Sequence, residues 1–217
     1  MNCAICEKRK EKRFCPAIHG RICPPCCGES REVTLDCPRE CVYLQQAREH
    51  EKPRPLDDLD QSVMFPQIQI GEQFIYEQEH LLLGLSFAMA NAARSDPSIK
   101  DADLIAALSS LAKTYETFVN SGLHYGEAMT SLGQQSVASE LQNMVKEYRE
   151  AEQKNTGVRR LRDGEVLFAL VFLLRVAYRR TNGRPKSRAF LDFLFSQFPE
   201  KQSRLAGEES ASRIILP

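Results

Sequence analysis

The sequence has no tryptophan, and it has no cysteine after Cys41. Its longest apolar run, residues 166–174, is far shorter than the roughly 20 residues that a membrane helix needs. The first ten residues, MNCAICEKRK, lack the apolar stretch of a secretory signal. We therefore expect a cytoplasmic protein without membrane contact, in which the thiols are kept reduced.

Net charge is also absent, because 29 basic side chains balance 29 acidic ones. The charges are nonetheless unevenly distributed along the chain. Residues 1–55 carry 11 basic and 8 acidic side chains, residues 56–155 carry 6 and 15, and residues 156–188 carry 9 and 2. The acidic middle and the basic stretch after it can attract each other within the fold or face separate partners.

All eight cysteines lie between residues 3 and 41, and most of them fall into pairs with the spacing of metal ligands. The four pairs are Cys3 and Cys6, Cys15 and His19, Cys23 and Cys26, and Cys37 and Cys41. A Cys-x-x-Cys turn brings two thiolates to one ion. Where proline follows the first ligand, as after Cys15 and Cys37, the partner four residues on can share one face of a helical turn. The spacing predicts two four-ligand sites for two Zn²⁺ ions.

The pairs can be grouped in two ways. In a cross-braced order, Cys3, Cys6, Cys23 and Cys26 hold one ion, and Cys15, His19, Cys37 and Cys41 hold the other. We favour this order because it joins pairs of like geometry. In a sequential order, the first two pairs share one ion and the last two share the other. In either order Cys27 can replace His19 as the eighth ligand.

This spacing resembles, in a generic way, that of cross-braced zinc modules such as the HIT, MYND and B-box fingers. The resemblance covers residues 3–41 only, and the His-rich second half of those patterns is absent. Disulfides, an iron–sulfur cluster, a thiol redox site and cysteines of an ordinary core are the alternatives. Nothing indicates export, no Cys-x-x-Cys-x-x-Cys run is present, and basic residues separate the first pairs. Structural zinc is therefore the favoured interpretation.

From residue 71 onward the apolar periodicity is helical. This periodicity predicts helices near 71–94, 101–120, 163–181 and 190–198, and a weaker one that ends before the polar stretch 150–157. A further short helix is predicted at 41–51. Asp101 is expected to be an N-cap, and residues 64–71 to form a short strand or an apolar arm. The predicted fold class is mainly α, with a small N-terminal zinc-binding module, treble-clef-like or cross-braced, followed by a four- to five-helix bundle.

The composition suggests four divisions of the chain. They are a Cys-rich zinc-binding module at 1–51, a linker or extended arm at 52–70, the helical bundle at 71–198, and a flexible tail with an apolar C-terminus at 199–217.

No phosphate loop, nucleophile elbow or His-Glu-x-x-His motif is present in the sequence. We predict no catalytic residues and a non-enzymatic adaptor whose zinc-stabilised module docks another protein; the bundle is a further surface for partners or for a homo-oligomer. The candidate contact residues are Lys8, Arg9, Lys10, Lys12, Arg13, Arg159, Arg160, Arg162, Arg184, Lys186 and Arg188. The alternative is a DNA- or RNA-binding regulatory protein that uses the Lys8–Arg13 loop and the arginine cluster at 159–188. A thiol redox protein or metalloenzyme is the third candidate.

Overall fold

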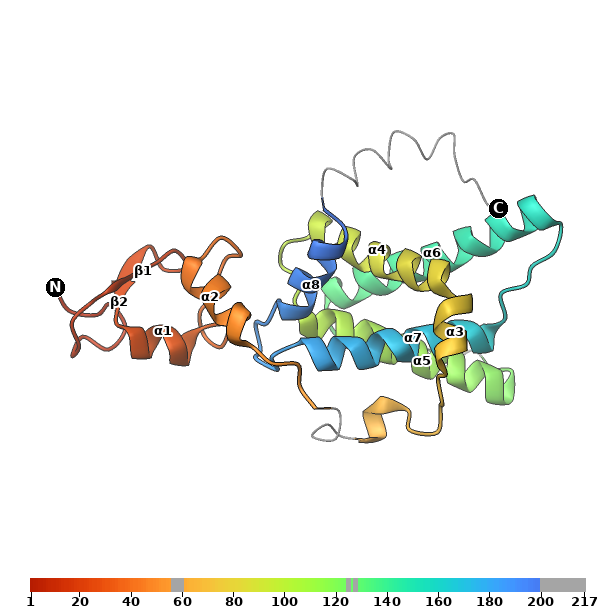
Figure 1. Ribbon diagram of the computed structural model, residues 1–217, viewed down its shortest axis with the longest axis horizontal. Coiled ribbons are helices and arrows are strands. Elements are labelled where there is room, and N and C mark those ends of the chain that lie inside the picture. The colour runs from red at the N-terminus through yellow and green to blue at the C-terminus, as the bar shows by residue number, and fades with distance from the viewer. Residues whose placement is uncertain (56–60, 124–125, 127–128, 200–217) are drawn as a thin grey trace.

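The computed structural model describes the chain except for residues 56–60, 124–125, 127–128 and 200–217. The described part is mainly helical, which confirms the predicted class (Figure 1). No helix in this part is both long enough and apolar enough to cross a membrane. The apolar end of the tail, at 214–217, lies outside the described residues, so the prediction about it stays open.

Residues 1–51, called here the cysteine-rich segment, contain a hairpin and two short helices. Strand β1 (Arg13–Cys15) pairs antiparallel with β2 (Gly20–Ile22), and Cys15 lies opposite Gly20. Helix α1 (Pro24–Ser30) follows directly, with prolines in its first turn, where a backbone N–H would have no partner within the helix. Helix α2 (Val42–His50) begins after Cys41, close to the predicted bounds.

The cysteine-rich segment has a small core of its own. Its buried apolar side chains other than cysteine are Ile22, Leu35 and Leu44, which pack with the cysteines. Three such side chains bury too little apolar surface to offset the conformational entropy lost by ordering the segment. Another source of stability is therefore required.

The helical region, residues 61–199, contains six α-helices and one 3₁₀ turn among its described residues. They are η2 (Gln61–Met64), α3 (Glu72–Glu77), α4 (Glu79–Ser95), α5 (Asp101–Ser121), α6 (Leu132–Thr156), α7 (Asp163–Arg180) and α8 (Ala189–Gln197). Helix α5 packs along α7, α4 packs along α6, and α8 covers one end of α4. The shared core is apolar and includes Leu85, Met89, Leu104, Leu108, Leu141, Leu170, Leu174 and Phe190.

Three helix bounds differ from the prediction. The helix expected at 71–94 is broken at Gln78, which lies between α3 and α4 and has a φ of −105° and a ψ of 21°. Asp101 is the first residue of α5 rather than its N-cap, which is Lys100. Helix α6 continues through the polar stretch to Thr156 and ends at Gly157, whose φ of 75° suits glycine. Polar residues are tolerated there because that end of α6 is exposed.

Residues 64–70 form an apolar arm and not a strand. Phe65 and Ile68 are buried in the core of the helical region. Arg175 of α7 holds the arm by donating to three carbonyl oxygens, those of Met64 at 3.1 Å and of Phe65 and Ile68 at 2.8 Å each. These hydrogen bonds satisfy backbone carbonyl oxygens of the arm, which in a strand would bond to a neighbouring strand.

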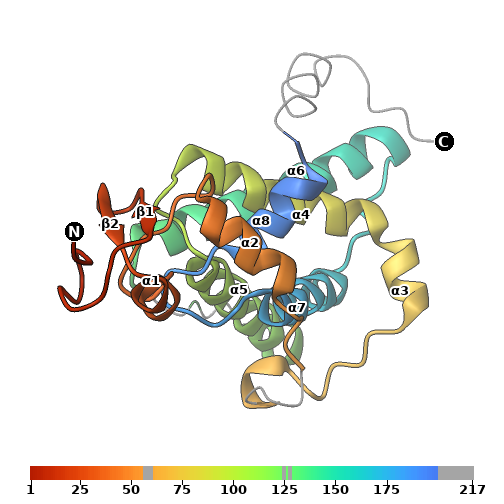
Figure 2. The same cartoon turned by 60° about the vertical axis from the view of Figure 1, so that its left-hand side comes forward.

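The cysteine-rich segment lies against the end of the helical region formed by α8 and the loop before it (Figure 2). Its contacts come from residues 28–51 and meet mainly residues 181–195, together with Lys100 at the start of α5. Arg184 donates to the carbonyl oxygens of Arg31 at 2.6 Å and Gly28 at 3.2 Å, and Arg39 of the segment binds Asp192 of α8 at 2.8 Å. The N-terminus lies at the opposite, outer end of the segment (Figure 1).

Candidate metal centre

The first cysteine pair is held in a tight turn near the N-terminus. The backbone N–H of Glu7 donates to the carbonyl oxygen of Cys3 at 2.8 Å, and the N–H of Cys3 donates to that of Arg9 at 2.9 Å. Glu7 has a positive φ of 54°, which reverses the chain directly after Cys6. The turn therefore places the side chains of Cys3 and Cys6 on one side.

The second pair lies at the start of helix α1. Cys23 is the N-cap, and Cys26 follows three residues later, so the two side chains share one face of the first turn. Strand β2 leads directly into Cys23 and fixes its position, because Ile22 is completely buried. The N–H of Cys23 also donates to the sulfur of Cys3 at 3.2 Å, which joins the two pairs.

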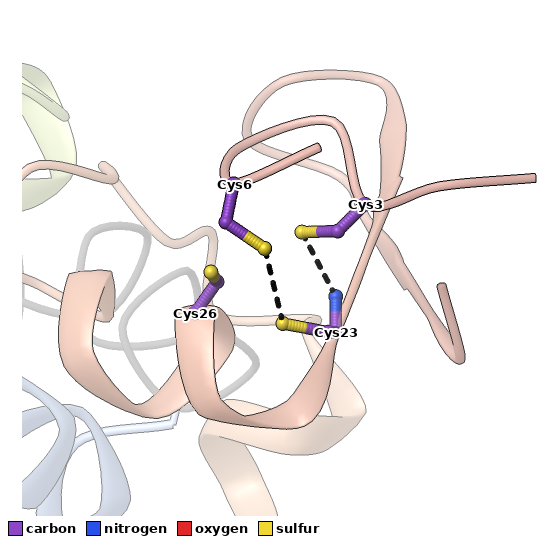
Figure 3. A group of neighbouring side chains, drawn as sticks. All are labelled: Cys3, Cys6, Cys23 and Cys26. Atoms are coloured by element: carbon purple, nitrogen blue, oxygen red, sulfur yellow. Dashed lines mark hydrogen bonds between the residues drawn. The ribbon is translucent and has the colours of Figure 1, made fainter. Parts of the chain in front are cut away.

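The four sulfur atoms of Cys3, Cys6, Cys23 and Cys26 all lie within 4.8 Å of one another (Figure 3). The sulfurs of Cys6 and Cys23 are 3.9 Å apart. Four sulfurs bound tetrahedrally at a Zn–S distance of about 2.3 Å would lie about 3.8 Å apart. The cluster is thus close to the dimensions of a tetrahedral thiolate site, and these four cysteines could hold one metal ion.

Backbone donors adjust the acidity of the first pair. Burial acts to raise the pKa of Cys3, but N–H groups of Cys6, Cys23 and Ile5 outweigh it and lower the pKa to about 6. The pKa of Cys6 is lowered by the N–H groups of Lys8 and Arg9. These donors stabilise thiolates, which are the form that binds metal.

Crowding has the opposite effect at Cys26. Its hydrogen bond to Cys23, together with burial, raises the pKa of Cys26 to about 12. Four thiols in so small a volume cannot all ionise, because the thiolates repel one another. A cation removes this obstacle by taking the place of the shared protons. The donor set therefore fits a divalent metal that prefers sulfur.

These four cysteines are the ones that the cross-braced order assigns to one ion. The sequential order would have placed Cys15 and His19 with the first pair, and the structure does not bring them there. Of the other predicted ligands, Cys15 and Cys37 are buried, Cys41 is half-buried and His19 is exposed. Within the described residues, no second group of three ligands is as tightly spaced as the first. Cys27, the alternative eighth ligand, is buried.

The predicted contact residues fall into three groups. The first, Lys8 to Arg13, lies on the outer part of the cysteine-rich segment, where Lys8, Lys10 and Lys12 are exposed. Arg13 is half-buried and stacks on the ring of Tyr43, with its guanidinium carbon 4.5 Å from the ring centroid. Arg9 approaches the sulfur of Cys23 at 4.0 Å, so it also faces the metal centre.

The other two groups lie at opposite ends of α7 and form no common surface. Arg159, Arg160 and Arg162 are exposed before the helix begins. Arg184, Lys186 and Arg188 follow its end and bind the cysteine-rich segment. Besides the Arg184 bonds described above, Lys186 donates to the carbonyl oxygen of Thr34 at 2.5 Å, and Arg188 binds Asp36 at 2.8 Å. The side chains of this third group therefore bind the cysteine-rich segment, through backbone carbonyl oxygens for Arg184 and Lys186 and through Asp36 for Arg188, and these bonds do not involve the acidic side chains of 56–155.

Glu32 is a central residue of this contact that sequence reasoning missed. It is buried, and its carboxylate binds Arg48 and the side-chain amide of Asn182, the latter at 2.8 Å. A single glutamate in a charged stretch carries no signal of burial. Its role depends on residues 150 positions further along the chain.

No family model matches this sequence, and no curated protein or solved structure is detectably similar to it. Its function must therefore be argued from its own residues.

Proposed function

We propose that this protein is a non-enzymatic adaptor in which zinc stabilises the cysteine-rich segment as a small recognition module. The observation that carries the proposal is the four-sulfur cluster of Cys3, Cys6, Cys23 and Cys26. Thiolate sets of this size favour Zn²⁺ among the common divalent ions. Metal binding supplies the stability that Ile22, Leu35 and Leu44 are too few to provide.

A structural role for the metal follows from the closed ligand set. Cys3, Cys23 and Cys26 are buried, and four protein ligands leave no position for a substrate or an activated water. In this proposal the module holds two zinc ions in cross-braced order. The hairpin β1–β2 and helix α2, which begins directly after Cys41, support a treble-clef-like module in this proposal.

Partner contact is assigned to the outer surface of the module. Lys8, Lys10 and Lys12 are exposed, and Phe14, which follows Lys12 by two residues on strand β1, is 53% exposed. A basic surface beside an exposed aromatic ring suits an acidic protein surface that also offers apolar contact. A metal-stiffened surface loses less entropy on binding than a mobile loop. The thiol chemistry requires a reducing compartment such as the cytoplasm.

Metal analysis and a charge-reversal series test this proposal together. Purified protein should contain zinc, and iron or no metal would overturn it. Partners should be identified by cross-linking in the native cell, and their affinities then measured with purified components. Reversing Lys8, Lys10 and Lys12 to Glu should weaken binding at least tenfold while the zinc content stays the same. The matched control reverses Arg159, Arg160 and Arg162, which lie far from the module.

The exposed lysines also support a second candidate, binding to nucleic acid through the same loop. This candidate predicts that affinity for RNA or DNA falls steeply with salt, with a log–log slope that scales with the number of phosphate contacts. Arg184, Lys186 and Arg188 are excluded from this surface because their side chains bind the chain itself. Salt-independent or undetectable binding would discard the candidate.

A further inference from the structure

The cysteine-rich segment contains four further cysteines outside the first centre. Cys15 ends strand β1, Cys27 lies in helix α1, Cys37 precedes the turn before α2, and Cys41 is the N-cap of α2. The first three are at most 7% exposed and belong to the same buried cluster, against which Cys41 packs. Four thiols that lie in or pack against one small buried cluster also supply the number of ligands that a tetrahedral zinc site needs.

Cys27 cannot belong to the first centre, although it follows Cys26 directly. Consecutive residues of a helix point about 100° apart, so the side chain of Cys27 leaves the face that carries Cys26. The first centre already has four sulfur ligands. Cys27 is nevertheless buried in the same cluster as Cys15 and Cys37. Its sulfur is thus directed into the segment on a side other than that of the first centre.

His19 has a different environment. It lies in the turn between β1 and β2, has a positive φ of 48° and is exposed to solvent. A histidine that ligates a structural metal directs a ring nitrogen into the site and is covered by the other ligands. The exposure of His19 is that of an ordinary turn residue.

Cys37 has two of the other cysteines as electrostatic neighbours. Burial raises the pKa of the Cys37 thiol, the backbone N–H of Glu32 opposes this, and the thiols of Cys41 and Cys15 raise it again. Cys15 and Cys37 also belong to one buried cluster against which Cys41 packs, so the three cysteines share one packed core. The turn from Cys37 to Cys41 is closed by a 3.0 Å bond from the N–H of Cys41 to the carbonyl oxygen of Pro38.

We propose that Cys15, Cys27, Cys37 and Cys41 hold the second zinc ion as four thiolates, and that His19 is not a ligand. This inference rests on the metal-binding function proposed above and names the residues of its second site. Each cysteine gives up its proton on binding, so loading both sites releases up to eight protons per chain.

The position of this second site ties it to the contact between the two parts of the chain. Cys37 follows Asp36, which binds both Lys100 and Arg188 at 2.8 Å. The carbonyl oxygen of Cys37 also accepts a bond from Arg188 at 3.5 Å. The first centre lies towards the N-terminus, and among the described residues none of its four cysteines has a hydrogen bond to the helical region. Loss of the second ion should therefore loosen the attachment of the segment to α8, whereas loss of the first should not.

The test uses the full-length protein and compares the metal content of matched variants. The wild type should bind two zinc ions per chain, His19→Ala should still bind two, and Cys27→Ser should bind one. Cys6→Ser is the reference for losing an ion from the first centre. One ion in the wild type, or loss of an ion in His19→Ala but not in Cys27→Ser, would overturn the second site as proposed. Absence of zinc from the wild type would overturn the proposed function itself.

Cobalt titration of the wild type keeps the inference testable if Cys27→Ser does not fold. Co²⁺ replaces zinc, and its thiolate charge-transfer absorption grows with the number of sulfur ligands. If both sites are all-thiolate, the second equivalent of Co²⁺ should add as much absorbance as the first. If His19 is a ligand, the second equivalent should add only about three quarters as much, because one of four ligands is not sulfur. The smaller increment would contradict the proposal.

Discussion

Arg48 of helix α2 forms a salt bridge with Glu32, a carboxylate that is only 1% exposed. The same carboxylate accepts bonds from the side chain of Asn182 at 2.8 Å and the backbone N–H of Arg188 at 3.1 Å. The carbonyl oxygen of Glu32 accepts from the N–H of Lys186 at 2.8 Å. One acidic residue thus joins α2, the loop after α7 and the start of α8.

Replacing Glu32 by Gln should destabilise the protein by about 1.5 to 3 kcal/mol, because it removes a buried, charge-assisted hydrogen bond to Arg48. Arg48 keeps Glu51 at 2.6 Å and Asp192 at 3.5 Å, so the loss should not exceed this range. Urea unfolding measures the change. The control is Glu150→Gln, whose partner Lys146 is exposed, and it should cost less than about 0.5 kcal/mol. Equal effects of the two substitutions would contradict the assigned role of Glu32.

Asp101 should be required for helix α8, although it belongs to α5. Its carboxylate accepts bonds from the N–H groups of Phe190 and Leu191, both at 3.1 Å, and from the hydroxyl of Ser187 at 2.6 Å. Asp101→Ala leaves two buried helix N–H groups without their acceptor and should cost about 2 kcal/mol. Hydrogen exchange should show faster opening of α8 before any change in α6. Ser187→Ala removes one donor only and should cost less.

The Arg175→Met substitution should release the apolar arm at 64–70. Methionine can fill much of the volume but cannot donate to the carbonyl oxygens of Met64, Phe65 and Ile68. Amide exchange in the arm and its cleavage by proteases should both increase, while α4 and α5 keep their protection. Arg175→Lys should give an intermediate result, because an ammonium group can reach fewer of the three acceptors at once. An unchanged arm in the methionine variant would show that burial of Phe65 and Ile68 is sufficient to hold it.

Removal of metal should unfold the cysteine-rich segment and leave the helical region folded. In the proposed function the segment depends on bound metal for stability, whereas the helical region has an extended apolar core. After treatment with a strong chelator, amides of β1, β2 and α1 should exchange at rates close to those of an unfolded chain, and those of α5 and α7 should remain protected. Full protection of the hairpin in metal-free protein would contradict a structural role for zinc.

Acid should weaken metal binding, since protons compete for the thiolates. The lowered pKa of Cys3, about 6, means that protons compete at this sulfur only below that pH. The raised pKa of Cys26 means that competition there extends to alkaline pH. Zinc affinity should therefore increase steadily as the pH rises from 5 to 8, which competition with a chromophoric chelator can measure. A flat profile would indicate that thiolates are not the ligands.

The part of the structure that the sequence could predict is the part determined by local spacing. Cys3 and Cys6 are ligand-like because a short turn brings them together, and the same holds for Cys23 and Cys26 at a helix start. The apolar period likewise indicated α5 and α7 to within a residue or two. In each case the physical cause lies within a few positions of the residues concerned.

Features that depend on distant segments could not be predicted in this way. Nothing local indicates that Glu32 is buried, or that Arg184 binds the carbonyl oxygens of α1 and not a partner. The break at Gln78 could not be predicted either, because no glycine or proline lies at that position. Asp101 has the sequence of a helix cap, and only the position of α8 shows that it caps a different helix. The choice between Cys27 and His19 depended on burial, which spacing alone does not report.

The contact between residues 28–51 and residues 181–195 has a consequence for the order of events during synthesis. The first cysteines leave the ribosome long before the loop after α7 exists, so the metal-bound segment can form early. Its acceptors for Arg184 and Lys186 must then stay in water until the loop after α7 has been made. A nascent chain stopped before residue 181 would keep the ion pair between Lys100 and Asp36 but would lack every contact that Arg184, Lys186 and Arg188 make.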